Sequence, residues 1–187
     1  MNNNRPPRAR IDAQRSESAL VDAARTIFLQ SGVDAPARDI AARAGVGVAT
    51  LYRSFPKRAD LVAAVFRREV DDCAAAAADI SAEQLPVDAL LMWLLRYARF
   101  IATKRGLATA LHSGDPTFEN LPEYFRSKFE PVLAGLLHNA QFAAPISGEV
   151  DAYDLLRAVG NLSVEGEGGA QHTERMVRLL VAGLSKG

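Results

Sequence analysis

The chain has 187 residues, of which 49% are hydrophobic, so it is long enough and apolar enough to bury a sizeable core. It has neither a run of about 18 apolar residues nor an apolar segment behind a charged N-terminus, which argues against a membrane span or secretory signal and predicts a cytoplasmic protein. The net charge of zero conceals an asymmetry, because residues 1–68 contain 12 Lys or Arg and 6 Asp or Glu, whereas the rest contain 10 and 16. The basic part either attracts a polyanion such as DNA or forms a solvated charged face.

Apolar residues recur at helical spacing almost throughout, and no segment alternates as a strand would. The predicted helices of the basic part span about 17–31, 34–45, 48–55 and 58–78. Gly32 and Gly45 are natural stops for the first two helices, and Pro56 ends the third. Asp34 is a candidate N-cap for the second helix, with Pro36 in its first turn. The fourth helix leads out of the basic region and is the predicted connector.

The acidic part also reads as helical. Its predicted helices span about 87–104, 121–142, 150–164 and 172–184. Turn formers separate the first two of these helices around 113–120, and the glycine-rich stretch 165–169 separates the last two. Pro131 is expected to kink or divide the helix that contains it. The sequence therefore predicts an all-α fold of about nine helices.

The most informative segment is 38–55, which has the spacing of a helix-turn-helix. Two short helices that cross steeply need a small residue at their closest approach and a glycine in the turn, and Ala41 and Gly45 meet these needs. Apolar residues must then hold the second helix against the first, and these are Ile40, Val46 and Leu51. Alternatively the segment is a helical hairpin packed on its own core, but that does not explain the basic residues on its polar side.

This part of the chain resembles the TetR family of bacterial transcriptional regulators. The residues that carry the resemblance are Phe28, Gly32, Asp39-Ile40-Ala41, Ala44-Gly45-Val46, Thr50-Leu51-Tyr52, Phe55, Arg58 and Leu61. The resemblance covers about residues 15–66, and 32–36 (Gly-Val-Asp-Ala-Pro) is similar to one subset of the family. It implies a flexible basic arm over 1–14, a three-helix DNA-binding domain over 15–66, and a helical ligand-binding and dimerisation domain over 67–187.

The resemblance also implies a set of DNA-contacting residues. They are Arg38, Gly47, Val48, Ala49, Thr50, Tyr52, Arg53, Ser54, Lys57 and Arg58. Tyr52 and Arg58 match positions that contact phosphates, and a phenol and a guanidinium are suitable donors for phosphate oxygens. The others match positions that reach bases or the adjacent backbone, where Arg38 could read guanine and the Thr50 methyl could meet thymine.

Four residues of this segment depart from the common family pattern. Gly47 replaces a serine or threonine and leaves the recognition helix without a side-chain cap, while Ala49, Ser54 and Lys57 replace glycine, histidine and a capping serine. These departures prevent the transfer of a known operator sequence. The N-terminal arm carries further basic residues that either contact DNA or have no consequence. These are Arg5, Arg8, Arg10 and Arg15.

The resemblance implies a homodimer formed by the last two helices as a four-helix bundle. The candidate interface residues are Tyr153, Leu156, Val159, Met176, Val177, Leu180, Val181 and Leu184. They form apolar stripes at helical spacing, as such a bundle requires. Alternatively both stripes cover the core of the monomer. Two recognition helices about 34 Å apart on one face of DNA need a dimer, which favours the interface.

The resemblance further implies a ligand pocket among the C-terminal helices. The candidate lining residues are Trp93, Tyr97, Phe100, His112, Phe118, Tyr124 and Phe125. Aromatic residues with hydrogen-bonding groups suit a small, largely apolar or aromatic effector. Alternatively these residues are plain core, since aromatic stripes at helical spacing usually pack.

Together these features predict a ligand-responsive repressor that binds a palindromic DNA operator as a homodimer. Activation rather than repression stays open, as does a helical protein-interaction module that keeps the fold without ligand-controlled DNA binding. An enzyme is not expected, because no phosphate loop, nucleophile elbow or nucleophile with a base partner is present. No catalytic residue, cofactor or metal is predicted, since the three histidines lie far apart and the single Cys73 reads as a buried apolar residue.

Overall fold

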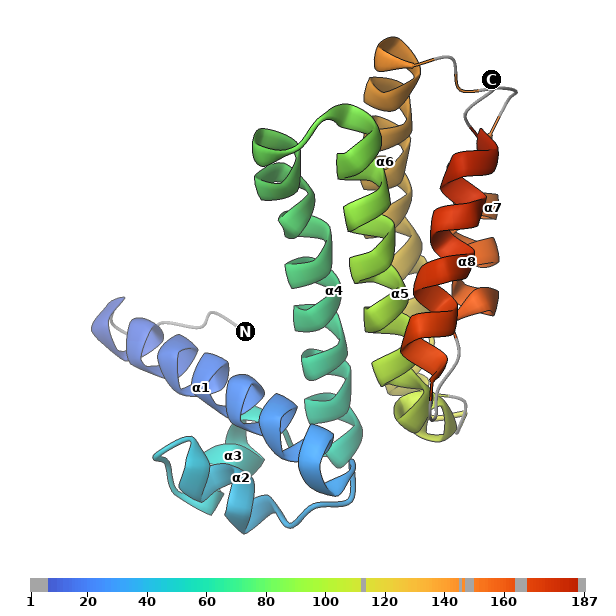
Figure 1. Cartoon of the computed structure of the whole chain (residues 1–187). Coiled ribbons are helices and arrows are strands. Elements are labelled where there is room, and N and C mark those ends of the chain that lie inside the picture. Colours follow the sequence, from blue (N-terminus) through green and yellow to red (C-terminus); the bar gives the residue numbers. More distant parts are fainter. Residues whose placement is uncertain (1–6, 112–113, 145, 147–149, 164–167, 185–187) are drawn as a thin grey trace. The chain divides into compact units, whose positions relative to one another are not determined.

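The computed structural model of the chain describes residues 7–111, 114–144, 146, 150–163 and 168–184, without the side chains of residues 7–10 and 103–111. Within these residues it consists of eight α-helices and one short 3-10 helix, which confirms the predicted all-α fold (Figure 1). The helices are α1 (Pro7–Ser31), α2 (Ala37–Arg43), α3 (Val48–Ser54), α4 (Arg58–Glu83), α5 (Pro86–Leu111), η1 (Pro116–Phe118), α6 (Leu121–Ala143), α7 (Ala152–Leu162) and α8 (Gly169–Leu184). In the described part of the chain, no helix combines the length and the apolar character needed to cross a membrane.

Contacts between residues divide the chain into two compact units. The first unit contains Met1–Arg68 and Ala110–Glu119, and the second contains Glu69–Thr109 and Asn120–Gly187. The helix α4 therefore begins in the first unit and ends in the second. Each unit buries its own set of apolar side chains.

The core of the first unit joins α1, α2, α3 and the start of α4. Its buried residues are Leu20, Val21, Ala23, Ala24, Ile40, Ala41, Leu51, Phe55, Leu61 and Val65. Figure 1 shows α2 and α3 crossing close to each other beside α1. The alanines of α1 and α2 allow this close approach, because a methyl group keeps the two backbones only a short distance apart.

Two glycines end the first two helices, as the sequence predicts. Gly32 and Gly45 have φ angles of 79° and 69°, in the left-handed region that other residues adopt only at a cost. After α2, the N–H of Gly45 donates to the carbonyl of Ala42 at 3.1 Å, and the N–H of Val46 donates to the carbonyl of Ala41 at 3.0 Å. These two bonds form a Schellman motif, which turns the chain sharply between α2 and α3.

The first helix begins at Pro7 rather than near residue 17. Residues 7–16 lack the apolar stripe on which the prediction depended, but their Arg, Ala and Gln residues favour helix, and proline is tolerated in a first turn. The start of α2 also differs, because Pro36 is the N-cap and no side chain donates or accepts a capping bond there. The prediction that Asp34 caps α2 is therefore wrong.

Several later helices also have other bounds than predicted. Both α4 and α5 run further, since alanine-rich sequence continues α4 until the chain reaches Pro86, and no proline interrupts α5. Pro131 does not divide α6, which continues through it as one helix. The carbonyl of Ser127 loses its helical partner there, but both residues lie on the exposed side of α6, where water can bind that carbonyl. The predicted flexible stretch 165–169 falls mostly outside the described residues.

The second unit is a bundle of the later part of α4 with α5, α6, α7 and α8 (Figure 1). Trp93 is fully buried at its centre, where its Nε1 donates to the carbonyl of Cys73 at 3.0 Å and ties α5 to α4. The hydroxyl of Tyr97 donates to the carbonyl of Leu156 at 3.3 Å and ties α5 to α7. Burial raises the pKa of the Cys73 thiol to about 11, because an apolar environment disfavours the thiolate. This burial agrees with the prediction of an inert apolar residue.

A pair of glycine substitutions tests the turn between α2 and α3. We expect Gly45→Ala to lower the free energy of unfolding by about 1 to 2 kcal/mol, because a Cβ disfavours the left-handed conformation. Gly47→Ala is the matched control, since Gly47 has an ordinary φ of −74° and open space where the Cβ would lie. It should lower the free energy of unfolding by less than about 1 kcal/mol, because alanine is a poorer N-cap than glycine but meets no steric barrier here. Urea unfolding of both variants measures the difference, and equal effects would contradict this account of the turn.

Candidate nucleic-acid interface

The helix α3 presents one face to solvent because its other face is held in the core. Leu51 is its one fully buried residue, and Thr50 and Ser54 are partly buried. The backbone N–H groups of Thr50 and Leu51 donate to the carbonyl of Gly47 at 2.9 and 3.3 Å and start the helix. Gly47 supplies no side-chain cap, as the sequence predicts. The N-terminal N–H groups of α3 are therefore open to an external acceptor.

Two large side chains are exposed on α3 although both are largely apolar. Val48 is 39% exposed and Tyr52 is 54% exposed. They are four residues apart, so they lie on the same side of the helix. An isopropyl group can contact a thymine methyl in the major groove, and a phenol hydroxyl can donate to a phosphate. Together with the exposed Ala49, they form a surface that lacks a covering group within the first unit.

Arg53 is exposed at the end of α3, with its orientation partly fixed. Its Nη2 donates to Oγ1 of Thr50, one turn earlier, at 3.0 Å. A guanidinium has five N–H donors, so the remaining ones can still bind a base edge or a phosphate. The bond to Thr50 limits the rotamers of Arg53, which lowers the entropy lost when it binds.

Two other predicted DNA contacts, Arg38 and Lys57, lie at the starts of helices. Arg38 is highly exposed on α2, and its Nε lies 3.3 Å from Oδ1 of Asp39. Lys57 is exposed just before α4, and its backbone N–H donates to Oδ2 of Asp60 at 2.9 Å. Asp60 thus supplies the carboxylate half of a capping box, so α4 begins normally although Lys57 replaces the usual capping serine.

Arg58 lies differently from the other basic residues of this surface. It is half-buried, and its Nε donates to the carbonyl of Val33 at 2.7 Å. Its Nη2 donates to the carbonyl of Ala35, and its guanidinium carbon lies 4.9 Å from the centre of the Phe28 ring. Burial lowers the pKa of Arg58, with Asp34 opposing that effect. The side chain therefore fastens α4 to the turn after α1, and a phosphate contact would use the donors that remain.

In the second unit, most of the predicted pocket residues form a packed aromatic cluster. Its members are Trp93, Tyr97, Phe100, Phe125 and Phe129. Ring centres lie 4.7 Å apart for Phe125 and Phe129 and 5.8 Å apart for Trp93 and Tyr97, which are contact distances. Burial raises the pKa of Tyr97 well above its usual value. These rings fill the space between α5 and α6 rather than lining an open cavity.

The other three predicted pocket residues lie elsewhere. Phe118 is buried in η1, which belongs to the first unit, and His112 lies outside the described residues. The hydroxyl of Tyr124 donates to Oδ2 of Asp71 at 2.7 Å, and Lys128 approaches Oδ1 of the same carboxylate at 2.9 Å. Burial, followed by this hydrogen bond, raises the pKa of Tyr124. This cluster ties the start of α6 to α4.

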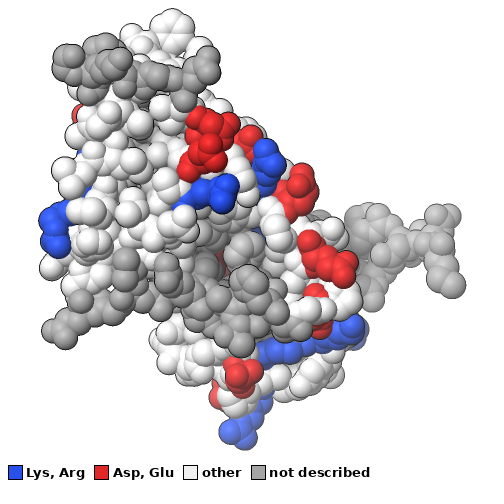
Figure 2. Space-filling view, turned by 90° about the vertical axis from the view of Figure 1, so that its right-hand side faces the viewer, with Lys and Arg blue, Asp and Glu red and all other residues white. Residues whose placement is uncertain are grey.

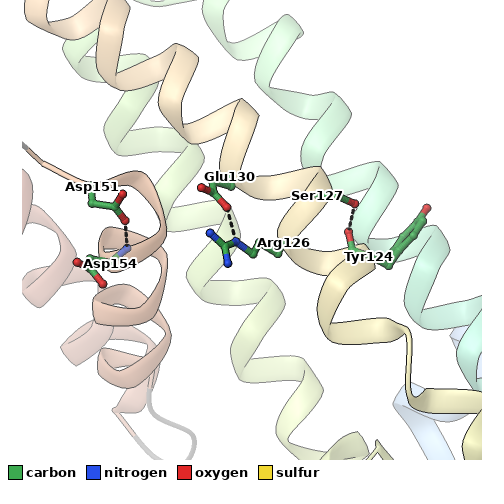
Figure 3. A network of polar contacts seen from close by, with 6 residues as sticks. All are labelled: Tyr124, Arg126, Ser127, Glu130, Asp151 and Asp154. Carbon is green, nitrogen blue, oxygen red and sulfur yellow. Dashed lines mark hydrogen bonds and ion pairs between the residues drawn. The ribbon is translucent and has the colours of Figure 1, made fainter.

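The opposite side of α6 makes a cation–π contact with α7. Figure 3 shows Arg126 and Glu130 joined on the side of α6 that faces α7, while Tyr124 leaves the helix on its other side. The guanidinium of Arg126 also lies 4.5 Å from the centre of the Tyr153 ring. Asp151 caps α7 by accepting a bond from the N–H of Asp154 at 2.8 Å. These contacts place Tyr153, a predicted interface residue, beside α6.

The predicted dimer-interface residues divide into two groups. Leu156, Val159, Val177 and Val181 are buried in the second unit itself. Tyr153, Met176, Leu180 and Leu184 are only half-buried, and Leu179 beside them is 64% exposed. Figure 2 views the side of Figure 1 on which α7 and α8 lie and shows scattered charges between wide uncharged areas. An interface would therefore use the second group together with Leu179.

Sequence reasoning missed Phe129 and Leu179. Phe129 follows Phe125 by four residues, so helical spacing already indicated that the two share one side of α6. Leu179 lies next to the apolar stripe of α8 but is exposed. The sequence prediction placed it neither in the core nor in the dimer interface. Both residues had a signal in the sequence, which was the spacing of large apolar residues on a single helix.

Two family models match the chain over most of its length. Residues 20–65 match the model described as bacterial regulatory proteins of the tetR family. Residues 85–186 match the model described as the C-terminal domain of SbtR-like transcriptional regulators. The first match covers the helix-turn-helix, and the second covers all of α5 to α8.

Solved structures resemble the whole chain. A TetR transcriptional regulator from Streptomyces coelicolor is 31% identical, with a TM-score of 0.72 over 90% of this chain and 98% of the other. A TetR transcription regulatory protein from Mycobacterium vanbaalenii is 30% identical, with a TM-score of 0.75 over 95% and 99% of the two chains. Both similarities extend across both units.

One relative is named as an enzyme rather than as a transcriptional regulator. A protein of Kitasatospora aureofaciens named hydroxyurea phosphotransferase is 36% identical over an alignment of 125 residues, and the match covers 60% of this chain. The chain spans about a third of the length of that relative, since the match covers 36% of it.

The role of Arg58 can be tested by stability. We expect Arg58→Ala to lower the free energy of unfolding by about 1 to 3 kcal/mol, because the carbonyls of Val33 and Ala35 lose a charged donor. Arg53→Ala is the matched control and should change stability by less than about 0.5 kcal/mol, since Arg53 is exposed. Chemical denaturation measures both values. If the two variants unfold alike, Arg58 does not fasten α4 as described.

Proposed function

This chain belongs to the TetR family of bacterial transcriptional regulators, and we propose that it is a ligand-responsive DNA-binding repressor. It acts in the cytoplasm as a homodimer on a palindromic operator and is released by a small, largely apolar or aromatic effector. The observation that carries the proposal is the exposed face of α3, where Val48, Tyr52 and Arg53 have no role in the core of the first unit. A seven-residue helix with this face fits the major groove.

In this proposal some residues of the first unit contact phosphates and others contact bases. Tyr52, Lys57 and the open N-terminal N–H groups of α3 hold phosphates and set the register. Arg38 and Arg53 read base edges, and Thr50 and Val48 contact thymine methyl groups. The basic residues before residue 16 add contacts to phosphate or to the minor groove.

The proposed dimer follows from the geometry of DNA. Two copies of α3 must lie about 34 Å apart to enter successive major grooves on one face of the duplex. The outward residues of α7 and α8 supply the contact, chiefly Met176, Leu180 and the exposed Leu179. A two-fold axis through this contact would give the operator its palindromic sequence.

The effector releases DNA only if it binds one conformation better than another. A coupling of about 1 to 3 kcal/mol changes the affinity for DNA by roughly 5- to 150-fold. The change reaches the DNA-binding residues along α4, since this helix belongs to both units. The proposal includes no enzymatic activity, since only 36% of the length of the relative named hydroxyurea phosphotransferase matches this chain.

Selection of bound sequences from random duplex DNA tests the proposed function. We expect the purified protein to enrich a palindromic motif, with an affinity that falls steeply as salt rises. Arg53→Ala should relax the preference at one position of each half-site and lower affinity by about tenfold or more. Tyr52→Phe should weaken all sequences by about 1 kcal/mol, because one hydrogen bond to a phosphate is removed.

Arg96→Ala is the control, because this exposed arginine lies on α5 in the second unit, outside the proposed dimer contact. It should leave both the motif and the affinity unchanged. If a folded dimer enriches no motif at low salt, the DNA-binding proposal fails and a protein-interaction module becomes the better interpretation. A reporter gene behind the recovered motif then separates repression from activation.

A charge on the outer side of α8 tests the proposed dimer. Leu179→Glu should shift the protein towards the monomer, because a carboxylate in an apolar contact loses its hydration. The fold of the chain should survive, since Leu179 is 64% exposed. Ala182→Glu, also exposed on α8, is the control and should stay dimeric. Sedimentation equilibrium reports the mass, and a Leu179→Glu variant that remains a dimer places the interface elsewhere.

A further inference from the structure

A groove of about 590 Å³ lies between α5 and α8, within the second unit. Its lining residues are Met92, Leu95, Ala98, Arg99, Ala102, Ala170, Gln171, Thr173, Glu174 and Arg178. The volume falls within the range of about 300 to 1,000 Å³ that is typical of sites for small ligands. The aromatic cluster of α5 and α6 contributes none of these residues, so the groove is separate from the predicted pocket.

The part of the groove formed by α5 is mainly apolar. Met92, Leu95, Ala98 and Ala102 recur at spacings of three and four residues and so form a continuous strip along the helix. Met92 is 43% exposed, although a thioether gains by burial and can adapt its shape to an apolar partner. Small alanines on this strip and Ala170 on α8 give the groove its depth. An apolar chain or ring would remove this strip from water.

The charged side chains of the groove are not equivalent. The guanidinium of Arg178 donates twice to Oε1 of Glu174, from Nε at 3.0 Å and from Nη2 at 2.8 Å. Arg99 has no acidic partner among the described residues, and its Nε donates to the carbonyl of Leu95 at 3.4 Å. Among the described lining residues the net charge is therefore +1, located on the guanidinium of Arg99. Both Nη atoms of that group remain to bind an anion bidentately.

The groove lies on a different side of α8 from the proposed dimer contact. Arg178 is two residues from both Met176 and Leu180, which places it about 200° around the helix from each. Leu179 is about 100° from Arg178 and lies at the edge of the proposed contact, so pairing centred on Met176 and Leu180 would leave the groove accessible.

We propose that the groove between α5 and α8 binds a small amphipathic monoanion, with a carboxylate on Arg99 and an aliphatic or aromatic body along Met92, Leu95 and Ala98. The apolar strip supplies most of the binding, and Arg99 selects the acid over its neutral analogue. This site is the effector site only if the proposed ligand-responsive function is right. Binding itself can be measured without DNA, so the two proposals fail separately.

An NMR titration of the full chain with sodium octanoate and, separately, with 1-octanol tests the site. Octanoate should shift the amide signals of α5 and α8 residues that line the groove and bind about tenfold more tightly than 1-octanol. Arg99→Gln should remove most of this preference, with Arg175→Gln on the exposed side of α8 as the control. Ala170→Phe should weaken both ligands by filling the groove, with Ala182→Phe as the control.

Three results would overturn the proposal. They are the absence of binding by both compounds, equal affinity for acid and alcohol, and binding that Ala170→Phe leaves unchanged in a variant with a native spectrum. If octanoate does not bind but Ala170→Phe alters the oligomeric mass, the groove is a protein interface and the ligand proposal fails. Octanoate binding that does not affect a recovered operator supports the site and removes its regulatory role. Operator binding without octanoate binding leaves the proposed function intact and rejects the site.

Discussion

A helix of seven residues is not stable in water by itself, so the position of α3 depends on the burial of Leu51. Leu51 lies in one core with Ile40 of α2 and Leu20 of α1. The left-handed conformation at Gly45 allows α2 and α3 to enter this core from different directions. Because a helix that turns one side inward must present the other side to solvent, the core fixes which residues of α3 can reach DNA. The binding face is thus a consequence of packing behind it.

The same constraint explains why Arg53 and Arg58, which are close in sequence, make different kinds of contact. Arg53 lies on the exposed side of α3 and makes one bond to a neighbouring hydroxyl, so most of its donors are available. Arg58 lies in the first turn of α4, next to the loop that joins α1 to α2, and it donates to two backbone carbonyls of this loop. Its pKa falls through burial, yet an arginine remains charged at any physiological pH. In the proposed function Arg53 therefore serves DNA binding, whereas the bonds of Arg58 stabilise the first unit.

The helices and the turn of the helix-turn-helix could be predicted because apolar spacing, glycine and proline determine the local backbone conformation, and these signals lie within a few residues of one another. The helical start at Pro7 was missed because residues 7–16 are helical without an apolar stripe. The inward position of Arg58 was missed for another reason, since its partners Val33 and Ala35 are about two dozen residues away and leave no periodic signal. Aromatic residues on α5 and α6 were predicted to line a pocket, but composition cannot tell whether rings contact one another or a ligand. Their centre-to-centre distances indicate the former.

These distances limit how an effector can act. A ligand placed between Tyr97 and Phe129, whose ring centres are 5.3 Å apart, must first separate them, and the free energy needed to part the rings subtracts from its affinity. The groove between α5 and α8 needs no such opening. In the proposed site a molecule bound to Arg99 on α5 also contacts α8, whose Ala170 lines the same groove, and these two helices are far apart in sequence. Its affinity changes whenever α8 moves relative to α5, and regulation requires that dependence of affinity on conformation.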